Sequence, residues 1–169
     1  AKSAIDMAML DLQGKLLGMP LHRLWGLDPE RVPKSSYTIG ISDAETIRAK
    51  TKTALSRGYD VLKLKFGAEN DVEMLEIVRA MAPHATLRVD ANAAWTVDHA
   101  LKMCRIMHEA GVEFVEEPLL LESPQANYER LKAESPLMLM ADESCHRLGD
   151  IPRCVEHFHA INLKHTKTG

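Results

Sequence analysis

Apolar and charged residues alternate along residues 61–67, and this pattern predicts a β-strand. Successive side chains of a strand point to opposite faces, so Lys63 and Lys65 face one side while the leucines and the phenylalanine around them face the other. Two like charges on one side of a strand are common at exposed sheet edges, where they oppose aggregation. The charged residues further along the chain favour a second role for these two lysines.

Helical spacing and short β-rich runs alternate along the rest of the chain. Apolar residues at helical spacing predict a helix over residues 1–17, namely Ala4, Ile5, Ala8, Met9, Leu12 and Leu16. Strands are predicted at 36–41, 61–66, 86–90, 112–116, 137–141 and 160–163, with helices between them at 43–57, 70–81, 97–110, 124–131 and 151–157. Six strands that alternate with helices indicate βαβ units and a parallel sheet.

Local signals predict where several of these helices begin and end. Ser42, followed three residues later by Glu45, is the expected capping box of the helix at 43–57. The buried side of that helix is expected at Ala44, Ile47, Ala54 and Leu55. Thr96 and Ser123 are the expected N-caps of the two helices that follow the third and fourth strands.

A charged residue stands at the end of every strand from the second to the sixth. These residues are Lys65, Asp90, Glu116, Asp142 and Lys164, at spacings of 25, 26, 26 and 22 residues. The period suits the compact repeats of a TIM-like barrel, whose eight units span about 250 residues. A flavodoxin-like open sheet is the alternative, but it would place ligands only at a switch point between strands. We therefore expect an α/β fold that forms part of a parallel barrel.

The carboxyl ends of the strands in a parallel barrel meet at one mouth, where the loops carry the active site. Strand alternation directs Asp90, Glu116 and Asp142 toward this mouth. Three crowded carboxylates would raise one another's pKa unless a cation lies among them. Oxygen ligands without a histidine or thiolate select a hard ion, and three carboxylates with positions left for water or substrate suit Mg²⁺. The sequence therefore predicts a magnesium site.

Lysines flank these carboxylates on both sides in strand order. Lys65 and Lys164 are expected across the mouth from each other, a geometry that can take a proton from one face of a carbon and return it to the other. Lys63 and the metal are expected to lower the pKa of Lys65 and so help it act as a base near neutral pH. Each carboxylate alone could be a helix cap or turn residue, but their joint placement favours a common function.

Composition and charge exclude several other classes of protein. The 169 residues carry a net charge of -3, which offers no large basic surface to nucleic acid. No apolar run approaches the ~20 residues that a membrane span needs, and no secretory signal is recognisable, so we expect a cytoplasmic protein. Cys104, Cys145 and Cys154 are expected to be free thiols. His157 and His159 are expected on the surface or in a loop.

The motifs at the strand ends resemble those of the enolase superfamily, specifically its muconate-lactonizing subgroup. The similarity covers nearly the whole chain and is carried by Lys63-Leu-Lys65, Asp90-Ala-Asn92, Val115-Glu-Glu-Pro118, Ala141-Asp-Glu-Ser144 and Ile161-Asn-Leu-Lys164 through Lys167-Thr-Gly169. The resemblance implies a partial (β/α)7β barrel, with residues 1–34 as a helical lead-in and residues 35–169 as the first six strands of the catalytic domain. By this resemblance we expect the N-terminal capping domain of that family and the last two strands of its barrel to lie outside this sequence.

The resemblance also implies a role for each residue at the mouth. Asp90, Glu116 and Asp142 would be Mg²⁺ ligands, and Lys65 and Lys164 would be the two acid/base lysines. Abstraction of a proton α to a carboxylate would give an enediolate held by the metal. By the same resemblance Lys63 would assist at the substrate carboxylate, and Asn92 and Glu143 would support the metal ligands.

Within the subgroup, the chain most resembles dipeptide epimerases that act on L-Ala-D/L-Glu substrates. That similarity makes Thr38 a candidate substrate contact. The alternatives are o-succinylbenzoate synthase, N-acylamino acid racemase and muconate cycloisomerase, which share the same lysines and ligands. A domain that binds metal but has lost catalysis is an alternative of another class. We expect the chain to be part of a longer polypeptide that forms a homo-oligomer, and to be inactive alone.

Overall fold

The computed structural model describes residues 2–168, and a parallel sheet of six strands forms its centre. The strands are β1 (Tyr37–Ile39), β2 (Val61–Lys65), β3 (Thr86–Asp90), β4 (Val112–Glu116), β5 (Met138–Ala141) and β6 (Ala160–Ile161). They lie side by side in chain order, without the reversal that marks an open doubly wound sheet. The predicted partial barrel is therefore confirmed, with all six strands present and the first, second, fifth and sixth shorter than expected.

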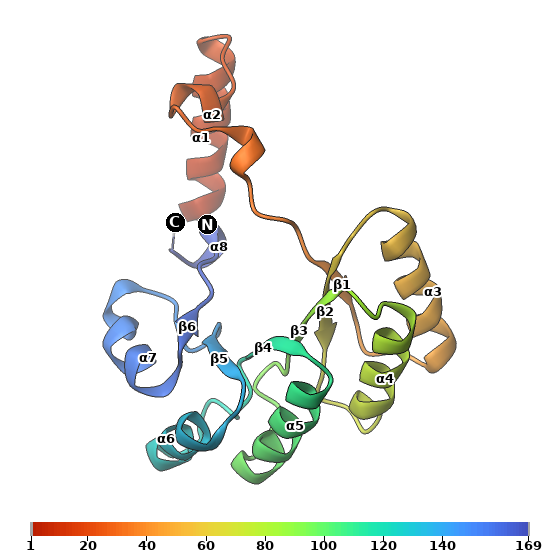
Figure 1. The fold of residues 1–169 in the computed structure, drawn as a ribbon. Coiled ribbons are helices and arrows are strands. Elements are labelled where there is room, and N and C mark those ends of the chain that lie inside the picture. The colour runs from red at the N-terminus through yellow and green to blue at the C-terminus, as the bar shows by residue number, and fades with distance from the viewer. Residues whose placement is uncertain (1, 169) are drawn as a thin grey trace.

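The helices lie along the outer side of this sheet. They are α3 (Ala44–Ser56), α4 (Asp71–Met81), α5 (Val97–Glu109), α6 (Gln125–Glu134) and α7 (Ile151–His157), and Figure 1 shows them in an arc around the strands. Two helices precede the sheet, α1 (Lys2–Leu16) and α2 (Leu21–Leu24), and α8 (His165–Thr168) follows it. Two short 3₁₀ helices, Pro29–Arg31 and Leu148–Asp150, lie in the connections. No helix within residues 2–168 is both long and apolar enough to cross a membrane.

The main core lies between the sheet and these outer helices. Leu62 and Leu64 of β2 are fully buried, as the strand alternation predicts, while Lys63 and Lys65 at the alternate positions remain partly exposed. Their apolar neighbours on β3 are also fully buried. Since the apolar residues of each strand face the helices, the polar residues of alternate positions face the interior of the barrel.

A β-bulge adjusts the pairing of β3 with β4. Leu87 pairs with Val112 and Val89 pairs with Val115, so β4 contains one more residue than β3 over the same length. Strict alternation would have placed Val112 on the same face as Glu116. The extra residue instead keeps Val112 and Val115 of β4 both buried. It also brings Asp90 level with Glu116 at the strand ends.

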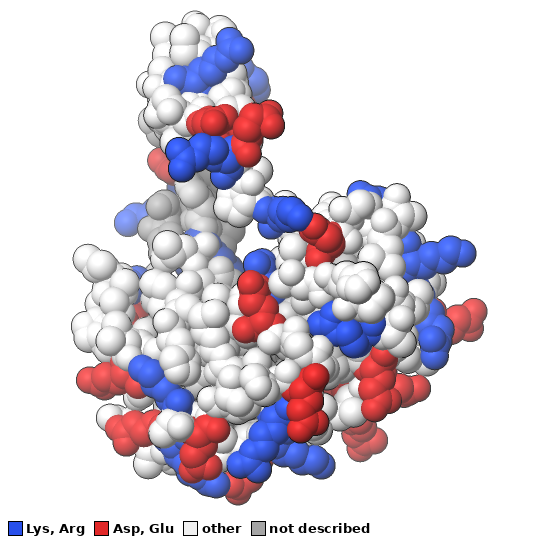
Figure 2. All heavy atoms as spheres, in the orientation of Figure 1, with Lys and Arg blue, Asp and Glu red and all other residues white. Residues whose placement is uncertain are grey.

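Helix α1 forms where it was predicted, but its apolar residues are exposed. Leu12 and Leu16 expose 55% and 78% of their surface, and Ile5 and Met9 are also exposed. Within residues 2–168 the helix contacts mainly α2 and α8, so its apolar stripe has no sheet to pack against. Figure 2 shows this segment projecting from the body of the molecule.

Two predicted helix starts are each wrong by one residue. Asp43, not Ser42, is the N-cap of α3, because its carboxylate accepts hydrogen bonds from the backbone and the hydroxyl of Thr46. Helix α6 begins at Gln125, with Pro124 rather than Ser123 at its N-cap. The cap of α5 is confirmed, since the Thr96 side chain accepts the His99 N–H.

Two predictions about burial are also corrected. Leu55 lies on the exposed side of α3, and Thr51 is buried in its place because its hydroxyl donates to the Ile47 carbonyl. His157 is not a surface residue: it ends α7, is buried, and stacks on the Tyr128 ring at 4.8 Å between centroids. The three cysteines are free, as predicted.

Candidate metal and acid-base site

Three carboxylates meet at the carboxyl ends of adjacent strands. Asp90 and Glu116 are the last residues of β3 and β4, and Asp142 directly follows β5. Each is almost fully buried, and one oxygen of each lies within 4.8 Å of the others. The structure therefore brings together the three residues that the sequence placed at the mouth.

Two lysines of β2 form one side of this group. The Lys65 Nζ lies 2.6 Å from Asp90 Oδ2. The Lys63 Nζ lies 2.8 Å from the same Asp90 oxygen and 2.5 Å from Glu116 Oε2. Both side chains point the same way because they are two residues apart on one strand.

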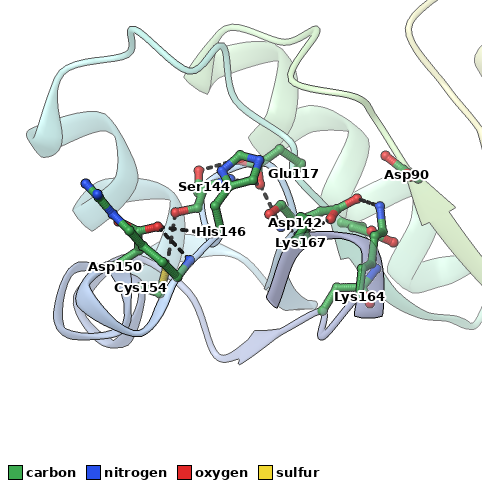
Figure 3. A network of polar contacts seen from close by, with 12 residues as sticks. Asp90, Glu117, Asp142, Ser144, His146, Asp150, Cys154, Lys164 and Lys167 are labelled. Carbon is green, nitrogen blue, oxygen red and sulfur yellow. Dashed lines mark hydrogen bonds and ion pairs between the residues drawn. The ribbon is translucent and has the colours of Figure 1, made fainter. Parts of the chain in front are cut away.

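The segment that follows β6 forms the other side. Lys164 contacts Asp142 Oδ2, so the two predicted lysines lie on opposite sides of the carboxylate group. Lys167, to which the sequence assigned no role, lies 2.5 Å from Asp142 Oδ1 and from the Asp142 carbonyl oxygen. Figure 3 shows both lysines directed at Asp142. Lys167 lies in α8, three residues after Lys164, and the available signal was the Lys167-Thr-Gly169 motif rather than any periodicity.

Asn162 is a second residue whose contact was not predicted. Its side-chain nitrogen donates to Glu116 Oε1 at 2.7 Å. Strand alternation had placed Asn162 on the same face as Lys164, so the signal was present. Glu116 is thus held from β2 by Lys63 and from β6 by Asn162.

Lys63 and Asp90 hold each other in the charged form. Burial disfavours the charge on Lys63, but its contacts with Asp90 and Glu116 outweigh burial and raise its pKa. Burial likewise acts to raise the pKa of Asp90, but hydrogen bonds from Lys63 and Lys65 lower it below its ordinary value. Asp90 is therefore ionised at neutral pH.

The pKa values of the other two carboxylates are shifted in opposite directions. Burial raises the pKa of Glu116, and the neighbouring Asp142 adds to this effect. Burial opposes the charge on Asp142 as well, but contacts with Lys164 and Lys167 lower its pKa to about 2. The same contact with Asp142 outweighs burial at Lys164 and raises the pKa of this lysine.

The donor set fits a hard divalent cation. It consists of carboxylate oxygens from three neighbouring strand ends, and no histidine or cysteine of the described chain joins this group. Buried carboxylates that lie this close together repel one another, and a divalent cation among them would remove that repulsion. The lysines contact the carboxylates from two sides. One oxygen of each carboxylate faces the other two, and these three oxygens would hold the ion.

The remaining predicted residues lie around this centre. Thr38 is exposed on β1 and pairs with Lys63 in the sheet register. Asn92 reaches a ligand through its backbone, whose N–H donates to Asp90 Oδ1 at 3.0 Å, while its side chain is exposed. Glu143 is half-buried and turns away toward a cavity of about 370 Å³ that Ser144 and His157 also line.

Family models match both parts of the chain. Residues 46–169 match the model described as "Enolase C-terminal domain-like". Residues 1–26 match the model of the mandelate racemase / muconate lactonizing enzyme N-terminal domain. The second match covers α1 and α2, the helices that precede the sheet.

Several curated proteins that are similar to this chain are named epimerases. The chain is 40% identical over 168 residues to an L-Ala-D/L-amino acid epimerase of Maribacter sp., covering 98% of this chain and 48% of the relative. It is 39% identical over 165 residues to the L-Ala-D/L-Glu epimerase of Bacteroides thetaiotaomicron, covering 97% of this chain and 42% of the relative. The chain thus spans about half the length of these relatives.

Solved structures show the same arrangement of strands and helices. A dipeptide epimerase from Cytophaga hutchinsonii, complexed with Mg and the dipeptide D-Ala-L-Val, matches with a TM-score of 0.79 at 27% identity, over 95% of this chain and 45% of that one. A muconate cycloisomerase from Pseudomonas fluorescens matches with a TM-score of 0.82 at 32% identity, over 98% and 47%.

Proposed function

We propose that this chain, which belongs to the mandelate racemase / muconate lactonizing enzyme family of the enolase superfamily, carries half of an epimerase that removes and returns the proton α to a carboxylate. One observation supports this most directly. A buried group of three carboxylates lies between Lys65 on one side and Lys164 on the other. Two bases on opposite sides of a site are what inversion at one carbon requires.

The two lysines would exchange roles according to the epimer that is bound. The lysine that faces the α-hydrogen must be neutral to accept the proton, while the lysine on the other side must be charged to donate one. Contact with Asp142 favours the charged form of Lys164, which suits it to donate a proton from its side in the second half of the reaction, after Lys65 has removed the α-proton from the other side. In the reverse direction the proton would return through Lys65.

The carboxylate group would bind the cofactor. Asp90, Glu116 and Asp142 would hold Mg²⁺, which when bound supplies positive charge at the substrate carboxylate and stabilises the negative charge that develops there. Lys63 would add a second positive charge on the β2 side, since its Nζ already lies between Asp90 and Glu116. Asn162 would keep Glu116 oriented through its hydrogen bond. Asn92, whose backbone N–H donates to Asp90, and Glu143, next to Asp142, would support the metal ligands.

The proposed substrate is a dipeptide of the L-Ala-D/L-Glu type. This substrate class is supported by the names of the relatives that are about 40% identical to the chain. Thr38 would contact the dipeptide, because it lies beside Lys63 with its side chain exposed. Muconate cycloisomerisation is the second candidate, supported by the match to a muconate cycloisomerase structure at a TM-score of 0.82.

Cell location and assembly complete the proposal. A cytoplasmic location is supported by three cysteines, Cys104, Cys145 and Cys154, that are buried and unpaired. The proposed partners are a small carboxylate substrate and further copies of the same protein, without nucleic acid or membrane.

Deuterium exchange tests the proposed reaction. The complete protein is incubated with Mg²⁺ in D₂O, and the α-proton of the Glu residue is followed by NMR in L-Ala-L-Glu and L-Ala-D-Glu. We expect exchange of both epimers and their interconversion, and we expect EDTA to stop both. Lys52→Ala, which removes an exposed lysine of α3, is the matched control and should exchange normally.

Assays with muconate and N-acylamino acids, together with a measurement of Mg²⁺ binding, separate the alternatives. If muconate is converted while neither dipeptide exchanges, the second candidate is correct. If Mg²⁺ binds but no dipeptide, N-acylamino acid or muconate reacts, the protein is a metal-binding domain without catalysis and the proposal fails.

A further inference from the structure

Glu117 lies directly behind the carboxylate group and has no part in the proposed chemistry. It follows Glu116 at the end of β4, but its side chain points to the opposite side and is fully buried. Its φ of 40° falls in the left-handed region, which residues with a Cβ adopt infrequently. A non-glycine residue keeps such a conformation only when the surrounding contacts enforce it.

The backbone of Glu117 joins the two neighbouring strand ends. Its N–H donates to the Met140 carbonyl of β5 at 2.9 Å. Its carbonyl accepts the Ala93 N–H at 2.7 Å, in the turn that follows Asp90. The left-handed conformation at Glu117 directs these two groups to opposite neighbours while the chain leaves the strand.

The side chain of Glu117 holds the third loop. Its Oε2 accepts the backbone N–H of Asp142 at 2.7 Å and that of Ser144 at 3.0 Å. Its Oε1 accepts the Ser144 hydroxyl at 2.6 Å. Figure 3 shows Glu117 directed at the turn that carries Asp142. One residue thus connects the strand ends that carry all three carboxylates.

We propose that Glu117 is a positioning residue that sets the spacing of the three carboxylates for a divalent cation. This inference rests on the proposed function, because it assigns Glu117 to the same metal site. Asp142 lies beyond Met140, the last residue of β5 that pairs with β4, so the sheet register alone does not hold its backbone against β4. The hydrogen bond from the Asp142 N–H to Glu117 fixes the backbone position from which the Asp142 side chain extends.

The contacts of Glu117 predict which replacements the site tolerates. A glutamine can accept both backbone N–H groups through its oxygen, and its amide can donate to the Ser144 hydroxyl, which also accepts hydrogen bonds. An alanine loses all three contacts and leaves two buried N–H groups without their partner. Geometry, not charge, is therefore what the replacements should test.

Magnesium titration tests the inference on the complete protein. Mg²⁺ affinity is measured by isothermal titration calorimetry, and thermal unfolding is measured in EDTA, for the wild type, Glu117→Ala and Glu117→Gln. We expect Glu117→Ala to weaken Mg²⁺ binding by about 10- to 100-fold, the usual effect of losing a group that orients metal ligands, while Glu117→Gln restores it to about the wild-type value. Glu113→Gln, on the same strand but paired with Arg88, is the control and should bind normally.

Each other outcome has a defined meaning. Unchanged affinity in Glu117→Ala overturns the inference, and so does an equal loss in both Glu117 variants, because a general loss of stability would then explain the effect. If Glu117→Ala does not fold, Ser144→Ala decides: removal of its hydroxyl should weaken Mg²⁺ binding, and unchanged affinity overturns the inference. If the wild type itself does not bind Mg²⁺, the proposed function fails instead.

Discussion

The two lysine-bearing sides of the site are built very differently. Lys63 and Lys65 lie inside a five-residue strand that is paired on both edges, with β1 and β3. Lys164 and Lys167 follow a two-residue strand at the sheet edge, and Lys167 lies in a helix of four residues. Each side nevertheless delivers two ammonium groups to the carboxylates.

This difference shows that sheet register positions one side and side-chain contacts position the other. On β2 the backbone alone determines that both lysines point to the mouth, because they share a strand face. After β6 the backbone leaves the sheet, so the ion pairs with Asp142 determine where the lysines lie. We therefore expect the β2 side to tolerate loss of its contacts better than the β6 side.

The largest expected effect comes from removing one acid/base lysine on each side. Lys65→Ala and Lys164→Ala should each lower epimerisation by about 10²- to 10⁴-fold, the usual contribution of a positioned acid or base. Each variant should still exchange the α-proton of one epimer, because one lysine remains on the other side. Exchange of each purified epimer in D₂O, followed by NMR, measures the difference. Equal partial losses from both epimers would contradict the two-sided mechanism.

A smaller effect is expected from the second lysine of β2. Lys63→Met removes a charge-assisted contact with the substrate carboxylate, and we expect kcat/KM to fall by about 10- to 100-fold, since such a bond contributes about 1.5–3 kcal/mol. Mg²⁺ binding should not weaken, because Asp90 and Glu116 lose a competing cation. Steady-state kinetics and calorimetry measure the two quantities. Loss of Mg²⁺ binding would mean that Lys63 supports the metal site instead.

The corresponding lysine on the β6 side should respond differently. Lys167→Met removes the contacts with the carboxylate and the carbonyl of Asp142, which hold this ligand at a position beyond the sheet. We expect kcat to fall by about 10-fold, as for other groups that orient a metal ligand, and Mg²⁺ affinity to fall with it. Kinetics at saturating Mg²⁺ and calorimetry check this. If Mg²⁺ affinity is unchanged in Lys167→Met, the two sides are equivalent and the comparison is wrong.

The sequence allowed the β2 side to be predicted almost completely. Alternation along 61–67 gave the direction of each side chain, and the regular spacing of strand ends placed Asp90 opposite Lys65, where the register now pairs them. The contacts of Lys167 and Glu117 were not predicted. They depend on a turn and on a left-handed residue, and neither feature leaves a periodic signal in the sequence.

The helices show the same limit for burial. The apolar residues of α5, including Met103 and Met107, are buried against the sheet, whereas the equally periodic Leu12 and Leu16 of α1 are exposed. Helical periodicity predicts that a face will pack against something, but it does not identify the surface that covers it. The cap of α3 was misplaced for a local reason, because Ser42 and Asp43 are both good N-caps and stand next to each other.

The smallest expected effect concerns the support behind β6. His157 ends α7, which packs against β6, and burial lowers its pKa below the ordinary 6.5; Arg153 and Lys132 act in the same direction, while Glu156 and Glu129 oppose it. The unfolded chain therefore binds a proton before the folded one does. The stability that neutral His157 provides is complete above about pH 6.5 and is lost as the pH falls from there toward the lower pKa of the folded state.

His157→Phe keeps the ring stack on Tyr128 without a titrating group. Thermal unfolding between pH 7.5 and 5.5 should show a steeper decline in the wild type than in this variant, and parallel declines would show that His157 does not make the β6 side sensitive to acid.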